Sequence, residues 1–328
     1  MRTLVKVTEA SPSQPEISTS NSAGKLKYSD FIHPKYWLTW LGISCLWLIA
    51  KVPLSIQVWM GKGFGLLAYH VIANRRHIAE VNIRLCFPEL NSAQQNDLVK
   101  ETFKSNAIGF FEAASAWFSN TERFRPITQA HGLEYLKQAQ SNGKGVILLG
   151  GHYSTLDLGG ALFNLFSRAA SMQRDHDNPL FNLVMTRRRL RFCESLLSKD
   201  DLRGLIKLLR QGRTIWYATD QDYGKRGSVW APFFGIPAAT ITATARIAAK
   251  TGAAVVPFSH FRNDRGGYDV YFGSAVKDYP SGDDVQDATI TNKIIEDEIR
   301  RHPDQYLWMH KRFKSQPTGK DHHLYGGK

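Results

Sequence analysis

Hydrophobic and polar positions divide the chain into segments of different character. Residues 1–30 are polar and rich in serine, with the runs 11–15 and 18–22 unable to bury a core. We expect a flexible tail there, and the lack of an apolar stretch argues against a cleaved signal peptide. From Tyr36 to Ala50, by contrast, fifteen residues carry no charge and include Trp37, Trp40 and Trp47.

The weakly charged region from residue 31 to residue 73 is expected to be a membrane anchor. Fifteen helical residues extend about 22 Å, whereas the hydrocarbon core of a bilayer is about 30 Å thick. A complete span would have to include Lys51 and tolerate Pro53. Because tryptophan suits the membrane interface, a short span or a helix in the membrane plane both fit, and a buried core helix is the alternative. The run Gly61–Gly65 lacks the preceding strand of a phosphate loop and predicts close helix packing or membrane contact.

The rest of the chain alternates between helical and strand-like patterns. A basic amphipathic segment runs from Asn74 to about Leu85, and Ser92–Gln95 has the spacing of a capping box at the start of a helix to Phe118. Apolar runs then predict strands at 146–149, 214–219, 254–259 and 268–272, separated by helices at 157–166, 202–210, 241–250 and 290–301. This alternation predicts an α/β sandwich with a largely parallel or mixed sheet over residues 74–316, followed by a polar tail at 317–328.

Charge narrows the possible partners. The chain holds 42 Lys+Arg against 29 Asp+Glu, a net charge of +13. Such a balance favours anionic partners: nucleic acid, an acidic membrane surface, phosphorylated ligands or an acidic carrier protein. Cys45, Cys86 and Cys193 are far apart and lack metal-binding spacing, so neither a disulfide framework nor a structural zinc site is expected.

The stretch from Leu149 to Gly160 carries the clearest chemical signal. An apolar strand leads into two glycines, then His152, then a helix with Asp157 in its first turn. Ligands collect at the carboxyl ends of such strands. We expect the Asp157 carboxylate to reach back to the imidazole, fix its tautomer and raise its basicity. The alternative is that His152 caps the helix and Asp157 is a solvated acid.

No protein nucleophile accompanies this pair. The motif Gly-x-Ser-x-Gly is absent, and Ser154 lies on the wrong side of the glycines for a nucleophile elbow. A histidine–carboxylate base without a nucleophile suits direct deprotonation of a substrate hydroxyl, which then attacks an acyl donor in a single displacement.

The same block provides a resemblance to a known family. A His-x4-acid block after a strand is the signature of the glycerolipid-type acyltransferase superfamily, and the surrounding sequence closely resembles the lipid A late acyltransferases, the lauroyltransferase-type enzymes of lipopolysaccharide assembly. The resemblance covers about residues 30–315, and lauroyltransferase-type members usually carry Glu where this chain has Asp157. The matching stretches are His33–Trp40, Leu85–Glu89, Gly151–Gly160, Asp220–Gly224, Ala231–Phe234 and Gln305–Phe313.

The resemblance implies a reaction and roles for residues. A fatty acyl group would pass from acyl carrier protein to a hydroxyl of the Kdo-modified lipid IVA precursor, with His152 as general base and Asp157 as its partner. Arg174 matches the family's arginine block and would bind the acceptor. Arg187 and Arg189, in the run 187–191, would bind phosphates or carrier-protein acids, although a solvated surface fits any single one equally well.

Asp220 and Asp222 follow the predicted strand at 214–219. Both are expected to shape the pocket, and a turn or capping role fits them as well as direct catalysis. A thioester donor needs no metal, so neither metal nor cofactor is expected. Acyl-acyl-carrier-protein is a co-substrate, and the fold implied is a glycerolipid-acyltransferase-like α/β sandwich with an N-terminal membrane-anchoring helix.

Location follows from this chemistry. Because acyl carrier protein is cytoplasmic, the catalytic domain should face the cytoplasm, with the anchor in the bacterial inner membrane and a phosphorylated glycolipid as acceptor.

A lysophospholipid (lysophosphatidate-type) acyltransferase would share His152 and Asp157, but the runs 220–224 and 308–313 favour lipid A. A non-enzymatic, basic, membrane-tethered binding protein would need a recognised binding fold with interleaved aromatic and basic residues, which the sequence lacks, so no nucleic-acid partner is expected. Acyl chain length, the acceptor position and the oligomeric state are not fixed by the sequence.

Overall fold

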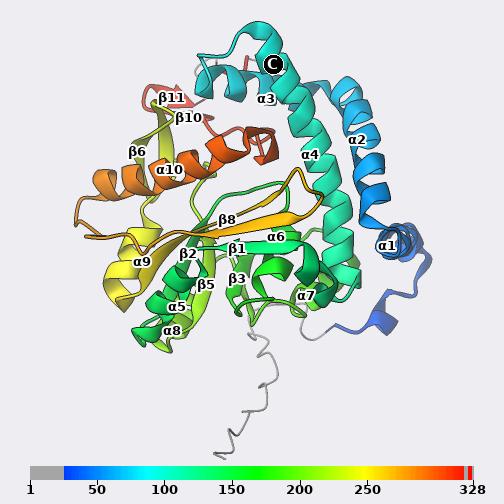
Figure 1. The fold of residues 1–328 in the computed structure, drawn as a ribbon, viewed down its shortest axis with the longest axis horizontal. Helices are drawn as coiled ribbons and strands as arrows, with labels where there is room; N and C mark the ends of the chain where they lie inside the picture. The colour runs from blue at the N-terminus through cyan, green and yellow to red at the C-terminus, as the bar shows by residue number, and fades with distance from the viewer. Residues whose placement is uncertain (1–25, 321–323, 327–328) are drawn as a thin grey trace, which may run out of the picture.

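A mixed sheet lies at the centre of the protein (Figure 1). The computed structural model describes residues 26–320 and 324–326. Within them, seven strands are ordered β1-β9-β8-β2-β5-β3-β4, and neighbours are parallel except for β8 and β9. The strands are β1 (Thr128–His131), β2 (Val146–Gly150), β3 (Ala170–Gln173), β4 (Leu196–Ser198), β5 (Thr214–Ala218), β8 (Ala254–Arg262) and β9 (Tyr268–Phe272). The predicted α/β class with a largely parallel or mixed sheet is confirmed.

Alternate residues of the central strand enter two separate hydrophobic cores. Ile147 and Leu149 pack into one core cluster, and Val146 and Leu148 into the other. This period of two follows from strand geometry, and it explains why β2 is apolar throughout: both of its faces are covered. Side chains of α8 (Leu202–Arg210), α9 (Ala243–Thr251) and α10 (Asp284–Arg301) join the first cluster, and those of α5 (Leu133–Ser141), α6 (Leu156–Phe163) and α7 (Pro179–Arg189) join the second.

The N-terminal part of the described chain is helical. It contains α1 (Trp37–Ile49), α2 (Leu54–Val71), α3 (Ala73–Cys86) and α4 (Ser92–Phe118), with α2 lying along α4 (Figure 1). Pro53 separates α1 from α2, so the predicted anchor comprises two helices. In the described part of the chain, no helix is both long and apolar enough to cross a membrane. The predicted capping box exists, but Asn91 rather than Ser92 forms it with Gln94.

Two glycines allow α2 to approach α4 closely. A Cβ atom at Gly61 would lie 2.7 Å from the Cα of Ile108, and one at Gly65 would meet the backbone of Phe103 and Lys104. Gly63, between them, has nothing within 4 Å of such an atom. Close helix packing, one of the two interpretations of the run Gly61–Gly65, is therefore confirmed at Gly61 and Gly65.

The chain also forms features that the sequence pattern did not reveal. A separate hairpin joins β6 (Ser228–Phe233) to β7 (Ile236–Ile241), and β10 (Ser315–Gln316) pairs with β11 (Gly319–Lys320). Tyr325, in the segment expected to be a polar tail, is buried, and its hydroxyl donates to Oδ1 of Asn82 at 2.6 Å. Of the expected N-terminal tail, residues 1–25 lie outside the described residues.

Candidate active site

His152 lies in the loop between β2 and α6, and its imidazole contacts the carboxylate of Asp220. Nδ1 is 2.7 Å from Oδ1 of Asp220, and the backbone N–H of His152 donates to Oδ2 at 2.8 Å. Asp220 follows β5, which pairs in parallel with β2. The carboxyl ends of neighbouring parallel strands meet at one edge of a sheet, so the two residues come together although they are far apart in sequence.

The pair sets the protonation state of the imidazole. Burial alone would raise the pKa of Asp220, but the charge of His152 and the hydrogen bonds from it lower that pKa to about 2. The carboxylate is therefore ionised, and Nδ1 of His152 is the nitrogen that carries a proton toward it. Burial lowers the pKa of His152, while the charge and hydrogen bond of Asp220 outweigh burial and raise it overall. In the neutral imidazole Nε2 is then the free base.

Asp157 has a different partner from the one expected. Its carboxylate accepts two hydrogen bonds from Arg189, from Nε at 2.7 Å and from Nη2 at 3.0 Å, and a third from the Trp117 indole at 3.0 Å. The prediction that Asp157 orients the His152 imidazole is wrong in this respect, because the first turn of α6 directs the carboxylate toward α7 and α4. Burial raises the pKa of Asp157, but Arg189 and Trp117 lower it overall, so it is ionised.

A largely apolar pocket of about 470 Å³ lies beside both charge pairs. This volume is in the usual range of ligand sites, about 300–1,000 Å³. His152, Asp157 and Arg189 line it together with side chains from several strands and helices. The apolar part of its wall includes Leu148, Phe163, Met185, Phe192, Leu196 and Trp216.

Polar residues after β3 complete the lining of this pocket. Arg174, predicted to bind the acceptor, is among them, and its side chain is 75% exposed and 3.9 Å from Asp177. Asn178, next in the chain, donates to the Thr39 hydroxyl on α1 at 2.9 Å. The chain directly after these pocket residues is thus bonded to the N-terminal helices. Arg187 is directed elsewhere: it donates to the Leu26 carbonyl at 2.8 Å and stacks over the Tyr28 ring.

Asp222 is a structural residue in this arrangement. It is buried, and its carboxylate accepts hydrogen bonds from the backbone N–H groups of Gly224 and Ser315, both at 2.7 Å. It therefore has the turn role considered for it and fastens the C-terminal segment to the loop after β5. Asp220, two residues earlier, is the one that contacts the imidazole.

Sequence reasoning missed His260, a buried residue of β8 that also lines the pocket. Its Nδ1 is 2.7 Å from the Thr155 hydroxyl, and burial lowers its pKa to about 3, so it stays neutral. A Cβ atom at Gly159 would overlap this ring, which explains the glycine there. The only available signal was a histidine inside an apolar strand.

His152, bonded to a buried carboxylate, lies at the wall of a largely apolar pocket, and among the described residues no serine or cysteine hydrogen-bonds to its imidazole. This arrangement suits the class of acyl-transferring enzymes of α/β fold. Residues 25–315 match the family described as bacterial lipid A biosynthesis acyltransferase, and the chain belongs to this family. It is therefore an acyltransferase that acts in lipid A biosynthesis.

Individual relatives cover most of the chain. It is 38% identical over 290 residues to the lipid A biosynthesis lauroyltransferase of Escherichia coli K12, and 37% identical over 292 residues to the palmitoleoyltransferase of the same organism. Each alignment covers 88% of this chain and 95% of the relative. Among solved structures, the 1-acyl-sn-glycerophosphate acyltransferase of Thermotoga maritima aligns with 14% identity and a TM-score of 0.38, over 77% of this chain and 99% of that one.

Proposed function

We propose that the protein transfers a fatty acyl group from an acyl-carrier-protein thioester to a hydroxyl of the Kdo-modified lipid IVA precursor. The observation that carries this proposal is the His152–Asp220 pair at the wall of an apolar pocket. Neutral His152 accepts the proton of the acceptor hydroxyl on Nε2, while Asp220 holds Nδ1 and stabilises the imidazolium that forms. The alkoxide oxygen bonds to the thioester carbon, the C–S bond breaks, and the proton passes to the departing thiolate.

The pocket provides the site for the acyl chain in this proposal. Its wall is mostly hydrocarbon and aromatic, which suits a fatty acyl chain and gives no favourable site to a sugar or a nucleotide. The named activities of the two Escherichia coli relatives concern lauroyl and palmitoleoyl groups. A chain in this range, placed along Leu148, Phe163 and Phe192, would bring its thioester carbon to the polar end at His152.

The Asp157–Arg189 pair would act at the same end of the pocket. Two hydrogen bonds hold the guanidinium in one orientation, and its Nη1 is 3.4 Å from Oε1 of Gln173. A fixed cation beside the reacting groups stabilises negative charge that develops on the carbonyl oxygen. Asp157 therefore contributes by holding Arg189, whereas the exposed Arg174 would bind a phosphate of the acceptor.

The N-terminal helices would bind the inner membrane on its cytoplasmic side. Apolar side chains of α1 and α2 are exposed: Trp37 (64%), Leu38 (79%), Leu41 (61%), Trp59 (75%), Leu67 (59%) and Val71 (70%). A surface of this kind marks a membrane or partner site, and Lys35, Lys51 and Lys62 add positive charge for anionic headgroups. Because Thr39 of α1 bonds to Asn178 beside the pocket, a lipid acceptor could enter without leaving the bilayer surface.

The test uses the purified protein in mixed micelles with Kdo-modified lipid IVA and a panel of acyl-carrier-protein thioesters, reading product mass. We expect acyl transfer, and a loss of at least about 100-fold in kcat for His152→Ala. Near wild-type turnover in this variant would reject the base. Arg174→Ala should raise KM for the acceptor and leave KM for the donor unchanged. Transfer to lysophosphatidate and not to the lipid A precursor would support the lysophospholipid alternative instead.

A further inference from the structure

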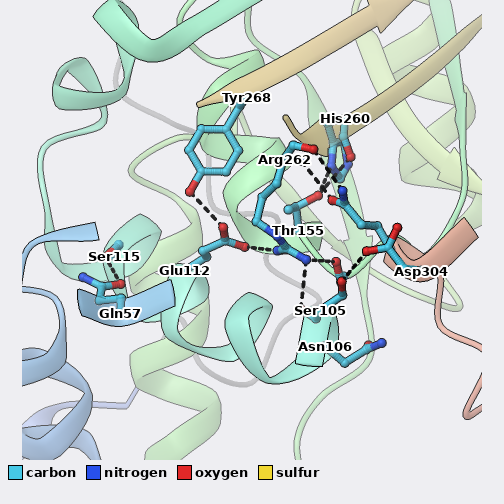
Figure 2. Close-up of polar contacts among 12 residues, drawn as sticks. Gln57, Ser105, Asn106, Glu112, Ser115, Thr155, His260, Arg262, Tyr268 and Asp304 are labelled. Atoms are coloured by element: carbon cyan, nitrogen blue, oxygen red, sulfur yellow. Dashed lines mark hydrogen bonds and ion pairs between the residues drawn. The ribbon is translucent and has the colours of Figure 1, made fainter. Parts of the chain in front are cut away.

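A buried polar network on the inner face of α4 reaches the loop that carries His152 (Figure 2). Its centre is Arg262, the last residue of β8. Nη1 of Arg262 donates to Oε2 of Glu112 at 2.6 Å, and Nη2 donates to the Ser154 hydroxyl at 2.9 Å and to the Ser105 carbonyl at 3.0 Å. Glu112 is 1% exposed, and its other oxygen accepts from the Tyr268 hydroxyl at 2.8 Å.

A second connection runs from the backbone of Arg262 to the same loop. The side-chain amide of Gln305 bonds to both the N–H and the carbonyl of Arg262, each at 2.9 Å. The Gln305 carbonyl accepts from the backbone N–H of Ser154 at 2.7 Å, and the N–H of Leu307 donates to the His152 carbonyl at 3.1 Å. Arg262 therefore holds the loop directly through its guanidinium and indirectly through residues 305–307.

Neither substrate binding nor stability explains this arrangement well. Within the described chain, Glu112, Ser154 and Arg262 are not among the residues that line the pocket. A buried ion pair is often no more stabilising than apolar side chains of the same volume, because both charges lose their hydration. What the planar guanidinium provides is a fixed fork that bonds three acceptors at once, so it sets the position of Ser154 relative to α4.

We propose that Arg262, held in place by Glu112, is a positioning residue for catalysis. It fixes the loop at residues 152–155 so that the His152 imidazole keeps its contact with Asp220 and its place at the pocket wall. This inference rests on the proposed role of His152 as base, and it assigns no substrate contact to Arg262.

Two serine variants, one in the His152 loop and one on α4, test the proposal. Ser154→Ala removes the hydroxyl that Arg262 binds and leaves the Arg262–Glu112 ion pair in place. Ser115→Ala is the control, because Ser115 is buried on α4, the helix that carries Glu112, and its hydroxyl donates to Oε1 of Gln57 at 2.9 Å, away from the loop (Figure 2). We expect similar decreases in melting temperature and a decrease of about tenfold in kcat for Ser154→Ala alone, with KM unchanged. Equal kcat values for the two variants would overturn the proposal.

Arg262→Lys tests the residue at the centre of the polar network. Lysine keeps the charge beside Glu112 but lacks the planar fork, so it cannot hold three acceptors in fixed directions. We expect a folded protein whose kcat is lower than that of Ser154→Ala. A folded Arg262→Lys protein with wild-type kcat would contradict the positioning role; if this variant does not fold, the serine pair decides.

A spectroscopic measurement separates this inference from the proposed reaction. The Nδ1 proton of His152, held against Asp220 at 2.7 Å, should give a downfield proton resonance in NMR spectra. We expect it to shift or broaden in Ser154→Ala and to stay unchanged in Ser115→Ala. If the wild-type protein transfers no acyl group, the proposed function fails while this comparison still tests the positioning. An unchanged resonance in Ser154→Ala would overturn the inference.

Discussion

Asp157 and Arg189 form a two-point ion pair, with Nε 2.7 Å from one carboxylate oxygen and Nη2 3.0 Å from the other. Both side chains are mostly buried, at 14% and 20% exposure. The His-x4-acid block therefore contributes to two separate charge pairs, since its histidine bonds to Asp220 and its acid bonds to Arg189. Each pair can be removed without removing the other.

Replacement of Asp157 by asparagine should mainly affect stability and the placement of Arg189. Loss of the Asp157 charge leaves the Arg189 guanidinium buried and unpaired. We therefore expect the free energy of unfolding, measured with denaturant, to fall by about 3 kcal/mol. Activity should fall, but the midpoint of the pH dependence of kcat/KM should not move, since Asp157 does not contact the imidazole. A shift of that midpoint as large as the one caused by Asp220→Asn would contradict these separate roles.

Replacement of Asp220 by asparagine should move the pH profile. General-base catalysis requires neutral His152, so activity should rise with pH through a midpoint above the ordinary value of 6.5, because the His152 pKa is raised. Without the Asp220 charge, burial dominates and lowers that pKa, so the midpoint should move to lower pH. At the same time kcat should fall at least about 100-fold, because the tautomer is no longer held.

Asp222→Asn is the control for this change. It removes another buried carboxylate from the same loop, one that bonds to backbone N–H groups and not to the imidazole. It should lower the melting temperature and leave the pH midpoint in place. An unmoved midpoint in Asp220→Asn would reject Asp220 as the partner of the base.

The His152–Asp220 pair makes a contribution to the stability of the folded protein that depends on pH. The pKa of His152 is higher in the folded protein than in the unfolded chain, so the contribution of its protonation is complete below about 6.5 and is lost as pH rises through the folded value. The pKa of Asp220 is lowered to about 2, so its contribution is present above the unfolded value and is lost as pH falls toward about 2. The free energies of unfolding of the wild-type protein and of Asp220→Asn, measured across this pH range, should differ least at the acid end.

Membrane binding should depend on the exposed face of α2. Trp59 is 75% exposed, and burial of a large apolar side chain is worth about 1.5–3 kcal/mol. We expect Trp59→Ser to weaken binding to anionic vesicles by about tenfold or more, measured by co-sedimentation, since 1.4 kcal/mol corresponds to a factor of ten. Val285→Ser, at an exposed apolar position on α10, is the control. Equal loss in both variants would argue against a docking role for α2.

Gly109 should be intolerant of any side chain. A Cβ atom there would overlap the carbonyl oxygen of Ser154, so Gly109→Ala must displace either α4 or the His152 loop. We expect a destabilisation of about 1–3 kcal/mol and a loss of kcat. Gly63→Ala, in α2 with open space around it, should instead stabilise by about 0.5–1 kcal/mol. Similar unfolding free energies for the two variants would contradict the close approach.

Local pattern was enough to predict most elements of the fold. Strand Tyr268–Phe272 and helices Ser92–Phe118 and Leu202–Arg210 begin and end where apolar periodicity and capping residues placed them. The hairpin from Ser228 to Ile241 was missed, because Pro232 lies within its first strand and obscures the pattern. Proline is uncommon in strands except at edges, and this two-stranded sheet consists only of edges.

The hydrogen-bond partner of His152 could not be predicted in the same way. His152 was found because a strand, two glycines and a helix start surround it in sequence. Its contact with Asp220 depends on strand order: β2 pairs with β5 although β3 follows it in the chain. Asp157 lies near His152 in sequence, so local pattern favoured it as the partner of the imidazole. The structure instead pairs Asp157 with Arg189, which lies one strand and one helix further along the chain. Such pairings are decided by topology, which local pattern does not contain.

The bonds from Ser154 to Gln305 and from Leu307 to His152 bear on how the enzyme is made in the cell. The loop that carries His152 is synthesised before the segment at residues 305–307 that bonds to its backbone. A nascent chain that ends before Gln305 already has the contacts of Asp220 and Arg262 with the loop, but it lacks these backbone bonds. Full activity should therefore require synthesis past residue 307, and a protease that cuts before Gln305 should lower the activity of the finished enzyme.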